Sequence, residues 1–509
     1  MATETELKLA VEPADLSRLA KSPLLAAAAR SKPMLRSVYS VYYDTPERDL
    51  ARRGMALRLR KVAGRWVQTL KTAGTAQAGL HSRGEFEANA AAQLLNFVAL
   101  AATPAQELFA DPDLRMRLQP LFVTEFKRST RVVEIHPGEL AELCVDRGTI
   151  TSGGRQDPIS EIELELKQGN PAHLFDFARR LLADIPLTVE NASKAERGYA
   201  LLTGARSTPV KAQAPALAAA LPVPDAFRVI VGECLRQLQA NDRGVLASDD
   251  VEYVHQARVA IRRLRSAFGL FRKVVPKAAL ATVLGDVKEL GTKLGGARDW
   301  DVFVTETLAS AAHSFPDHPG FRLIANLADA SRAAARQLAR SAIAAPAYTA
   351  LLLDFGALLT GEAWRTGLDD EGRALEAMTI GGFATVVLDA QWRRVRRAGK
   401  DHRDLAPAEL HALRIEVKKL RYAIEFFQTL HARKAVRSFL DHAAELQEIL
   451  GALNDATVTS HLLDTLMADN RSVVEAAGIV RGWGAARVHD GRSRFAGAWK
   501  RFEAAQPYW

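Results

Sequence analysis

Cysteine is nearly absent from this chain of 509 residues, which contains only Cys144 and Cys234. Two such residues, one in each half of the chain, build neither a disulfide framework nor a cysteine metal cluster, and they fit a reducing cytoplasm. Long apolar runs are missing as well, because the longest stretches, such as APAYTALLLDFGALLTG, are short and carry an aspartate. We therefore expect no transmembrane span, and the acidic N-terminus without an apolar segment predicts no secretory signal.

The charge is not balanced, and this excess is informative about binding partners. Lysine and arginine number 68 against 59 acidic residues, which gives a formal net charge of +9. A basic surface attracts polyanions without specifying which one. The length predicts two or three domains, since a chain of this size exceeds a single hydrophobic core.

The first half of the chain has the period of β-strands. Residues 1–203 contain short segments that alternate polar and apolar residues or are rich in β-formers, separated by glycine-rich turns. Besides the opening ETELKL, these segments are LRLRK (57–61), WVQTLK (66–71), RGEFE (83–87), FVTEFKRSTRVVEI (122–135), LCVDRG (143–148) and SEIELELK (160–167). Helices are predicted at 13–30, 91–109 and 171–184, with a last one starting near Asn191.

The second half has the period of helices. Residues 204–224 are rich in alanine and proline and are predicted to be an extended, fairly stiff linker. Residues 225–509 follow with long amphipathic helices and no convincing strand. The sequence therefore predicts an α+β domain at 1–203 and an all-α domain at 225–509.

Charged residues of the first half repeat on one face of each predicted strand. Glu4, Glu6 and Lys8 share a face, as do Arg58 and Arg60, and as do Arg83, Glu85 and Glu87. Glu161, Glu163 and Glu165 form a ladder that repels itself unless cations face it. A closed antiparallel barrel with a polar lumen unites these faces, and such a lumen suits a metal-bound polyphosphate chain. The alternative is a set of solvated strand faces, and the spacing leaves the face of Arg128 undecided.

Seven motifs in order carry a specific resemblance over residues 1–203. They are E-x-E-x-K, YYDTPERDLARRGMALRLR, WVQTLK, RGEFE, VDRG, SEIELEL and SKAERGYAL. This half resembles the CYTH domain, the family of triphosphate tunnel metalloenzymes. The resemblance implies a closed eight-stranded antiparallel tunnel whose members hydrolyse or cyclise substrates that carry a triphosphate.

The same resemblance implies roles for individual residues. The metal-binding carboxylates, for Mg²⁺ or Mn²⁺, correspond to Glu4, Glu6, Glu163 and Glu165, with Glu161 as a possible substitute in the second pair. The phosphate-holding cations correspond to Lys8, Arg58, Arg60, Lys71, Arg128 and Lys194. Glu87 and Asp146 correspond to the remaining acidic positions, which orient basic residues or a metal-bound water. Glu4, Glu6, Lys8, Glu87 and Asp146 are thus the expected catalytic set.

The second half contains an internal duplication. VHQARVAIRRLRSAFGLF begins its motif at His255 and LHALRIEVKKLRYAIEFF at His411, an offset of 411 − 255 = 156. LGGARD ends at Asp299 and LGALND at Asp455, again 455 − 299 = 156. In both copies a row of cations borders the apolar stripe of the helix, so two related helices would direct both rows at a shared groove. Packing alone requires the stripe to repeat and does not require the cations.

This half resembles the CHAD domain over residues 225–509, with repeats at about 225–370 and 371–509. The resemblance implies tandem four-helix bundles that bind inorganic polyphosphate through a basic channel. The residues that carry it are His255, Arg258, Arg262, Arg263, Arg265, His411, Arg414, Lys418, Lys419 and Arg421. Nucleic acid is the rival ligand, but the cations are not interleaved with aromatic residues that stack on bases. Each copy shows one histidine without a companion at metal spacing, which favours phosphate contact or helix anchoring over metal binding.

Together these patterns predict a cytoplasmic inorganic triphosphatase with an appended polyphosphate-binding module, which would tether it to polyphosphate granules. The alternatives are a nucleotide or thiamine triphosphate hydrolase, an adenylate cyclase with the same tunnel, or a non-catalytic polyphosphate scaffold. The preferred triphosphate and metal, the polyphosphate chain length, the oligomeric state and communication between the domains stay open at this point.

Overall fold

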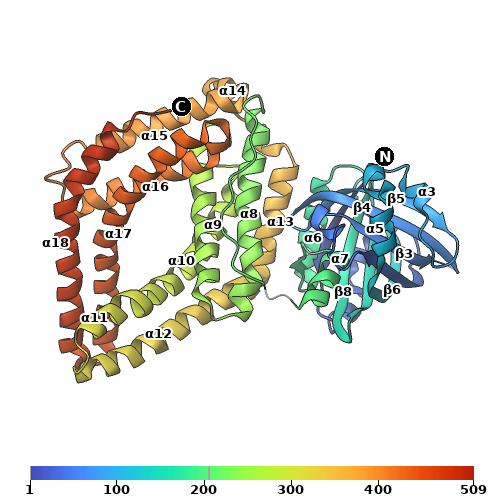
Figure 1. The fold of residues 1–509 in the computed structure, drawn as a ribbon, viewed down its shortest axis with the longest axis horizontal. Helices are drawn as coiled ribbons and strands as arrows, with labels where there is room; N and C mark the ends of the chain where they lie inside the picture. The colour runs from blue at the N-terminus through green and yellow to red at the C-terminus, as the bar shows by residue number, and fades with distance from the viewer. Residues whose placement is uncertain (1, 63, 205–206) are drawn as a thin grey trace. The chain divides into compact units, whose positions relative to one another are not determined.

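The computed structural model describes residues 2–62, 64–204 and 207–509. The chain divides into two compact units (Figure 1). The first comprises Met1–Ser207 and Ala345–Ala363, and the second comprises Thr208–Ala344 and Trp364–Trp509. The first unit is a β-barrel with helices around it, and the second is helical.

The barrel is a closed antiparallel sheet of eight strands. The strands follow the order β5-β4-β3-β2-β6-β7-β8-β1, and pairing of β1 with β5 closes the ring. A two-residue strand, β9 (Thr188–Val189), adds to β1. The strands are β1 (Ala2–Ala10), β2 (Met34–Asp44), β3 (Ala56–Val62), β4 (Arg65–Gln77), β5 (Leu80–Ala90), β6 (Gln119–His136), β7 (Glu139–Ser152) and β8 (Arg155–Gln168). Closure confirms the predicted eight-stranded tunnel.

One strand of the barrel, β2, was not predicted from the sequence. The predicted strand segments all lie within β1 or β3–β8, whereas β2 was not among them. The first four residues of β2 are exposed, and most of its later residues are buried on both faces. Such a strand shows no sustained alternation of polar and apolar residues, and this alternation is the pattern that predicts a half-buried strand.

The barrel has apolar packing outside and at one end of its interior. Leu7 and Leu9, whose side chains alternate with the charged ones of β1, lie in the outer core. Inside, residues of β2, β6, β7 and β8 pack against α7 (Lys194–Thr203) and form an apolar plug. α7 approaches β6 so closely that a Cβ on Gly198 would lie 2.2 Å from the Phe122 ring. The lumen is therefore blocked by apolar side chains at the α7 end, and its charged residues lie beyond the plug.

Short helices connect and cover the strands of the first unit. The longest of the N-terminal half, α6 (Ala172–Asp184), packs its apolar face on the outer core. The others are α1 (Leu16–Leu19), α2 (Pro23–Ala28), α3 (Phe97–Leu100), α4 (Gln106–Ala110) and α5 (Pro112–Arg117), with a 3₁₀ turn at Ala51–Arg53.

A helix from the second half of the chain also belongs to the first unit. α13 (Pro346–Thr360), which contains the longest apolar stretch of the sequence, lies beside α6 (Figure 1). The Thr349 hydroxyl donates a 2.7 Å hydrogen bond to the Leu187 carbonyl, and a Cβ on Gly356 would lie 2.0 Å from the Phe175 ring. The sequence predicted a helix here as part of the all-α domain at 225–509, whereas in the structure the helix belongs to the first unit.

The second unit contains two series of four long helices. Equivalent helices keep the offset of the sequence repeat: α9 starts at Val251 and α16 at Pro407, and 407 − 251 = 156. The first series is α8 (Val223–Ala247), α9 (Val251–Leu270), α10 (Ala281–Val302) and α12 (Pro319–Ala344). The second is α15 (Ile380–Ala398), α16 (Pro407–Phe427), α17 (Arg433–Asp469) and α18 (Val474–Ala504). Shorter elements are a π-helical turn at Phe303–Leu308, α11 (Ala309–Ser314), α14 (Asp370–Glu376) and 3₁₀ turns at Ala363–Arg365, Gln428–Leu430 and Arg471–Val473.

The predicted linker packs on the second unit over most of its described length. The Val210 backbone exchanges two 2.9 Å hydrogen bonds with the Asn241 side chain, and the Leu217 amide donates to the Thr429 hydroxyl at 3.2 Å. Residues 205–206 of the predicted linker lie outside the described residues. The segment is extended, as its composition indicates, and the side chains of the buried Asn241 and the exposed Thr429 bind its backbone.

The composition predicted no transmembrane span and no disulfide framework. Among the described residues, no single helix is both long and apolar enough to cross a membrane; α12 and α13 meet these two conditions only as a pair, across the break at Ala345. Cys144 and Cys234 are both buried free thiols.

Candidate functional site

A cavity of about 550 Å³ lies in the barrel lumen, and charged side chains from most of the strands line it. Its described lining contains seven carboxylates and seven cations, so its formal charge is 7 − 7 = 0. The carboxylates are Glu4, Glu6, Glu85, Glu87, Glu142, Glu163 and Glu165. The cations are Lys8, Arg58, Arg60, Lys71, Arg83, Arg128 and Lys194. The rest of the lining is Tyr42, Ala56, Ser193 and Ala195.

Like charges face each other where β1 meets β8. In this antiparallel pair Glu6 lies directly opposite Glu165, and Lys8 lies opposite Glu163. Two carboxylates at directly opposed positions destabilise a sheet unless a cation lies between them. Burial raises the pKa of Glu165 above its ordinary value, and the nearby Glu4 adds to the shift. This end of the lumen therefore combines carboxylates that gain stability from an added cation.

Lys194, the first residue of α7, neutralises the acidic cluster next to the plug. Asp146, Glu161 and Glu163 bring carboxylate oxygens within 4.8 Å of one another. The Lys194 ammonium lies 2.7 Å from Asp146 and 2.9 Å from Glu163 and also pairs with Glu161. Burial disfavours the charged ammonium, but these three carboxylates outweigh it and raise the pKa of Lys194. Because the ammonium contacts all three, it stands where a metal bound by this cluster would stand.

Loss of the Lys194 ammonium is expected to destabilise the first unit strongly. Lys194→Met removes the charge and leaves three buried carboxylates without their shared partner, at a cost of about 3–5 kcal/mol in the free energy of unfolding. Chemical denaturation of the variant and of wild type measures the difference. Lys167→Met is the control, since Lys167 is exposed and pairs only with Glu165 among described residues. Equal stability of Lys194→Met and wild type would contradict the role given to this residue.

The wall formed by β3, β4 and β5 carries four cations toward the lumen. Lys71 pairs with Glu4 at 2.6 Å and with Glu85 at 3.1 Å, and Arg83 pairs with Glu6 at 3.2 Å. Arg58 reaches Glu85 at 3.3 Å.

Arg60 stands apart from its neighbours on this wall. No hydrogen bond or ion pair joins it to any residue that the structure describes, and its buried Nε has no acceptor. Burial and the positive charges of Arg58 and Arg128 lower the pKa of Arg60 to about 10. The Nε atoms of Arg58 and Arg83 are also buried without acceptors. An anion in the lumen would satisfy these guanidinium donors.

Most of the tunnel residues predicted from the sequence lie together in this cavity. Arg128, whose face the spacing left open, points inward and donates to Asp146 at 2.7 and 2.6 Å. Asp146 and Glu161 lie behind the lining, fully buried against Lys194. Glu161 also pairs with Arg197 at 3.3 Å, so Glu163 and Glu165 are the members of the ladder that reach the cavity.

Five polar lining residues were not among the predicted site residues: Tyr42, Arg83, Glu85, Glu142 and Ser193. Arg83 and Glu85 share the strand parity of Glu87 in RGEFE, and Glu142 shares that of Asp146, so parity alone could have found them. Tyr42 is on the unrecognised strand β2, and Ser193 caps the helix that closes the lumen.

A groove of about 800 Å³ lies in the second unit, where α9 runs beside α16. Its described lining contains nine cations and three carboxylates, so its formal charge is 9 − 3 = +6. The cations are Arg258, Arg262, Arg265, Arg272, Arg298, Arg394, Arg414, Lys418 and Lys419, and the acids are Asp299, Glu306 and Asp455. His255 and His411 lie in the same wall. Arg272, Arg298 and Arg394 were not among the predicted residues. Arg298 lies in LGGARD, where the second copy has an asparagine in LGALND, whereas Arg272 lies in the turn after α9 and Arg394 lies on α15.

Two predicted cations of the repeat do not reach this groove. Arg263 is only 1% exposed; its guanidinium donates to the Gln237 side chain and the Gln213 carbonyl, both at 3.0 Å, and lies over the Phe426 ring. Arg421 bonds Glu425 at 2.7 Å and Gln447 at 3.0 Å and is outside the lining. Arg263 follows Arg262 by one residue, or about 100° around the helix, which turns it from the groove into the core.

The crowding of cations in the groove changes their protonation. Burial lowers the pKa of Lys418 to about 7, and the positive charges of Arg262 and Arg414 contribute. The pKa of Arg414 is also lowered, first by burial, although Asp455 opposes the shift. Arg258 is the one paired most directly, with Asp299 at 2.6 Å. This surface therefore carries an excess of positive charge that its own acids do not balance.

Comparison with protein families agrees with the division into two units except at Ala345–Ala363, which lies within the match of the second family but belongs to the first unit. The CYTH domain model matches residues 2–199, and the CHAD domain model matches residues 229–464. The crystal structure of the CHAD domain from the plant Ricinus communis is 32% identical, with a TM-score of 0.51, and covers 59% of this chain and 98% of that one.

Two curated relatives extend the comparison. A Haemophilus influenzae protein named inorganic triphosphatase is 36% identical over 208 residues, which are 40% of this chain. The match spans 55% of that protein, or about half its length. The Mycobacterium tuberculosis protein MT2285 is 28% identical over 470 residues, or 85% of this chain and 82% of that one. The two matched families, in this order along the chain, make it a CYTH–CHAD protein, with a triphosphate tunnel domain followed by a CHAD domain.

Proposed function

We propose that the tunnel hydrolyses inorganic triphosphate to pyrophosphate and phosphate with a divalent metal, and that the groove of the CHAD domain binds inorganic polyphosphate. The observation that carries the first part is the set of guanidinium groups, Arg58, Arg60 and Arg83, whose buried Nε atoms face the lumen without acceptors. Triphosphate oxygens are acceptors that arginine binds well, including in bidentate geometry.

The charge balance of the tunnel supports a metal-bound substrate over a free one. A lining of zero formal charge gains little from a bare polyanion, whereas a triphosphate whose charge is largely compensated by divalent cations leaves the balance intact. Glu4, Glu6 and Glu165 fit this requirement, because Glu6 and Glu165 are opposed like charges and all three line the cavity. Glu163 is the fourth candidate ligand, although it already contacts Lys8 at 2.8 Å and Lys194 at 2.9 Å. Carboxylate oxygens suit Mg²⁺ or Mn²⁺.

The protein's own residues then have distinct tasks. A bound divalent cation supplies charge neutralisation at the phosphoryl oxygens and a more acidic coordinated water. Arg58, Arg60, Lys71 and Arg83 hold phosphate oxygens along one wall and oppose the charge that develops on the bridging oxygen. Asp146 is a positioning residue, since it is buried and acts on substrate only through Arg128 and Lys194. Glu87, which accepts from the Thr69 hydroxyl at 3.2 Å, lies in the lining and can orient a water.

Inorganic triphosphate fits the described lining better than a nucleotide does. Fourteen of its eighteen residues are charged, and Tyr42 is the one aromatic ring among them, so this lining offers little surface for a base or a thiazolium ring. We expect phosphate release from tripolyphosphate to exceed release from ATP and thiamine triphosphate by at least about tenfold in kcat/KM, with Mg²⁺ or Mn²⁺ present. Faster turnover of ATP or thiamine triphosphate would assign the tunnel to that substrate instead, and formation of cyclic AMP would make it a cyclase.

The lining of the groove has a net positive charge, whereas that of the tunnel is neutral, and we infer that the groove holds polyphosphate without needing a metal. Its excess of six positive charges, contributed by segments of both copies of the repeat, suits a chain that presents only negative charge. Binding there would concentrate the tunnel domain on polyphosphate, at granules where these exist.

The affinity of the groove for polyphosphate is expected to fall as the pH rises from 6 to 8. Lys418 has a pKa of about 7 in the free protein, so it loses its proton over this range. A polyanion binds the protonated ammonium more tightly, so binding above pH 7 requires Lys418 to take up a proton. The linked loss approaches about tenfold per pH unit above the pKa. Titration of fluorescent polyphosphate at several pH values measures it. Lys418→Arg keeps the charge at every pH and should flatten the profile, while an unchanged slope in Lys418→Arg would rule out Lys418 as the source.

A further inference from the structure

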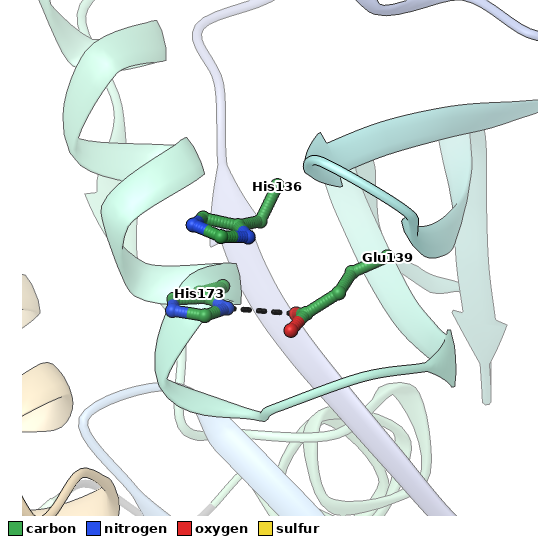
Figure 2. A group of neighbouring side chains, drawn as sticks. All are labelled: His136, Glu139 and His173. Atoms are coloured by element: carbon green, nitrogen blue, oxygen red, sulfur yellow. Dashed lines mark hydrogen bonds and ion pairs between the residues drawn. The ribbon is translucent and has the colours of Figure 1, made fainter.

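Two histidines and a glutamate meet on the first unit at a place unconnected with the tunnel lining. His136 ends β6, Glu139 begins β7, and His173 is the second residue of α6. Figure 2 shows the two imidazoles one over the other beside the Glu139 carboxylate. Their ring centroids are 4.1 Å apart with an angle of 11° between the planes. None of the three lines the described tunnel cavity.

The candidate ligand atoms of this trio are close enough to share one ion. One nitrogen of each imidazole and a Glu139 oxygen all lie within 4.8 Å of one another. The His173 Nδ1 and Glu139 Oε2 are already 2.7 Å apart. Ligands bound at about 2.0–2.1 Å to one tetrahedral zinc lie roughly 3.3 Å from each other. The two rings are stacked, so one imidazole must turn its nitrogen lone pair toward an ion shared with the other ligands. His136 is exposed, which leaves room for this rotation.

The backbone holds these residues in place without a metal. His136 and Glu139 flank a two-residue hairpin turn in which Gly138 has a φ of 77°, so the turn fixes their spacing. Glu139 Oε2 also accepts from the Asn170 amide at 3.0 Å, and the Asn170 side chain accepts from the Ala172 amide at 3.0 Å at the start of α6. Contacts of this kind orient ligands around protein metals and raise affinity.

We propose that His136, Glu139 and His173 form a binding site for a late first-row divalent cation of the zinc class. Two imidazoles and one carboxylate match the preference of Zn²⁺, whereas the carboxylate oxygens of the tunnel match Mg²⁺ or Mn²⁺. The three residues come from a hairpin and a helix far apart in sequence, so the ion clips the β6–β7 hairpin to the start of α6. The site is separate from the proposed reaction and does not depend on it.

The test is metal binding to the full-length protein without a histidine tag, in excess Mg²⁺ so that the tunnel carboxylates are occupied. We expect one equivalent of Zn²⁺ in calorimetry, a visible absorption spectrum of tetrahedral or five-coordinate type with Co²⁺, and a rise in the unfolding temperature with Zn²⁺. His136→Ala and His173→Ala should each weaken Zn²⁺ binding by about 10- to 100-fold or more and remove the thermal shift.

Controls separate this site from other metal binding on the molecule. His489→Ala, which removes an exposed histidine of α18, should bind Zn²⁺ as wild type does. Glu4→Gln/Glu6→Gln should also keep the Zn²⁺ equivalent, since it changes only the tunnel. Zn²⁺ affinity in the His136→Ala/His173→Ala protein equal to that of wild type would overturn the proposal, as would the absence of any Zn²⁺ equivalent in wild type. Tripolyphosphate hydrolysis with Mg²⁺ is expected to be unchanged in His136→Ala, so failure of the proposed tunnel activity and failure of this site give different results.

Discussion

Glutamine in place of both Glu4 and Glu6 is expected to abolish hydrolysis of tripolyphosphate. The substitutions keep the side-chain shapes but change the described lining from seven carboxylates and seven cations to five and seven. Glu6 would no longer oppose Glu165 with a like charge, and the candidate metal ligands of β1 would be lost. We expect kcat/KM to fall by about 10³-fold or more, since loss of a charge-stabilising group alone costs about 10²–10³. Phosphate release with Mg²⁺ or Mn²⁺ measures the effect.

The matched control for this prediction lies on the same barrel. Glu125→Gln changes an exposed carboxylate on the outer face of β6 and should leave turnover unchanged. Retention of polyphosphate by the Glu4→Gln/Glu6→Gln protein would show that the chain is folded and that only the tunnel is affected. If the double variant turned over tripolyphosphate at the wild-type rate, the catalytic site would lie elsewhere. If wild type itself showed no turnover, the tunnel would be a binding module instead of an enzyme.

Charge reversal in the groove is expected to abolish retention of long-chain polyphosphate. Arg262 and Lys418 come from the two repeats and line the same groove, and the positive charge of Arg262 contributes, after burial, to the lowered pKa of Lys418. Arg262→Glu/Lys418→Glu lowers the formal charge of the lining from +6 to +2, and we expect the affinity to fall by about 10²-fold or more at moderate salt. Pull-down with biotinylated polyphosphate, repeated over a range of salt concentrations, measures the loss.

A second double variant separates local charge from net charge. Arg322→Glu/Lys434→Glu makes the same change in net charge at exposed positions outside the groove, on α12 and α17. We expect it to retain polyphosphate nearly as wild type does. Equal losses in both variants would show that the whole surface attracts the chain and that the groove is not a specific site.

Sequence periodicity predicted the charged faces correctly wherever one strand or one helix decides them. The alternation in ETELKL and SEIELELK directs Glu4, Glu6, Glu163 and Glu165 to one face, and the structure has all four in the lumen. The offset of 156 between the two copies likewise predicted equivalent helices, and α9 and α16 lie side by side. In both cases the information is local, because a side chain's face depends on its own backbone.

Periodicity was insufficient where several segments meet. Helix geometry turns Arg263 away from the groove, but it did not predict that Gln213 and Gln237 approach from other segments and bind its guanidinium. The sequence did not predict the face of Arg128; in the structure its side chain lies in the lumen and donates to Asp146, which is 18 residues away. The apolar run of α13 was visible in the sequence, but its packing on α6 depends on a surface formed more than 160 residues earlier.

The amino-acid sequence by itself determined that the chain has two kinds of domain, a tunnel of strands and a repeated helical unit. It also determined most of the charged side chains that line the cavity of each domain. Only the folded molecule decided which of those charges oppose one another: Glu6 against Glu165, Lys194 among three carboxylates, and two histidines beside Glu139. The reason is that strand register and helix docking are set by contacts between distant segments, and a linear pattern contains the face of each residue but not its neighbour across the sheet.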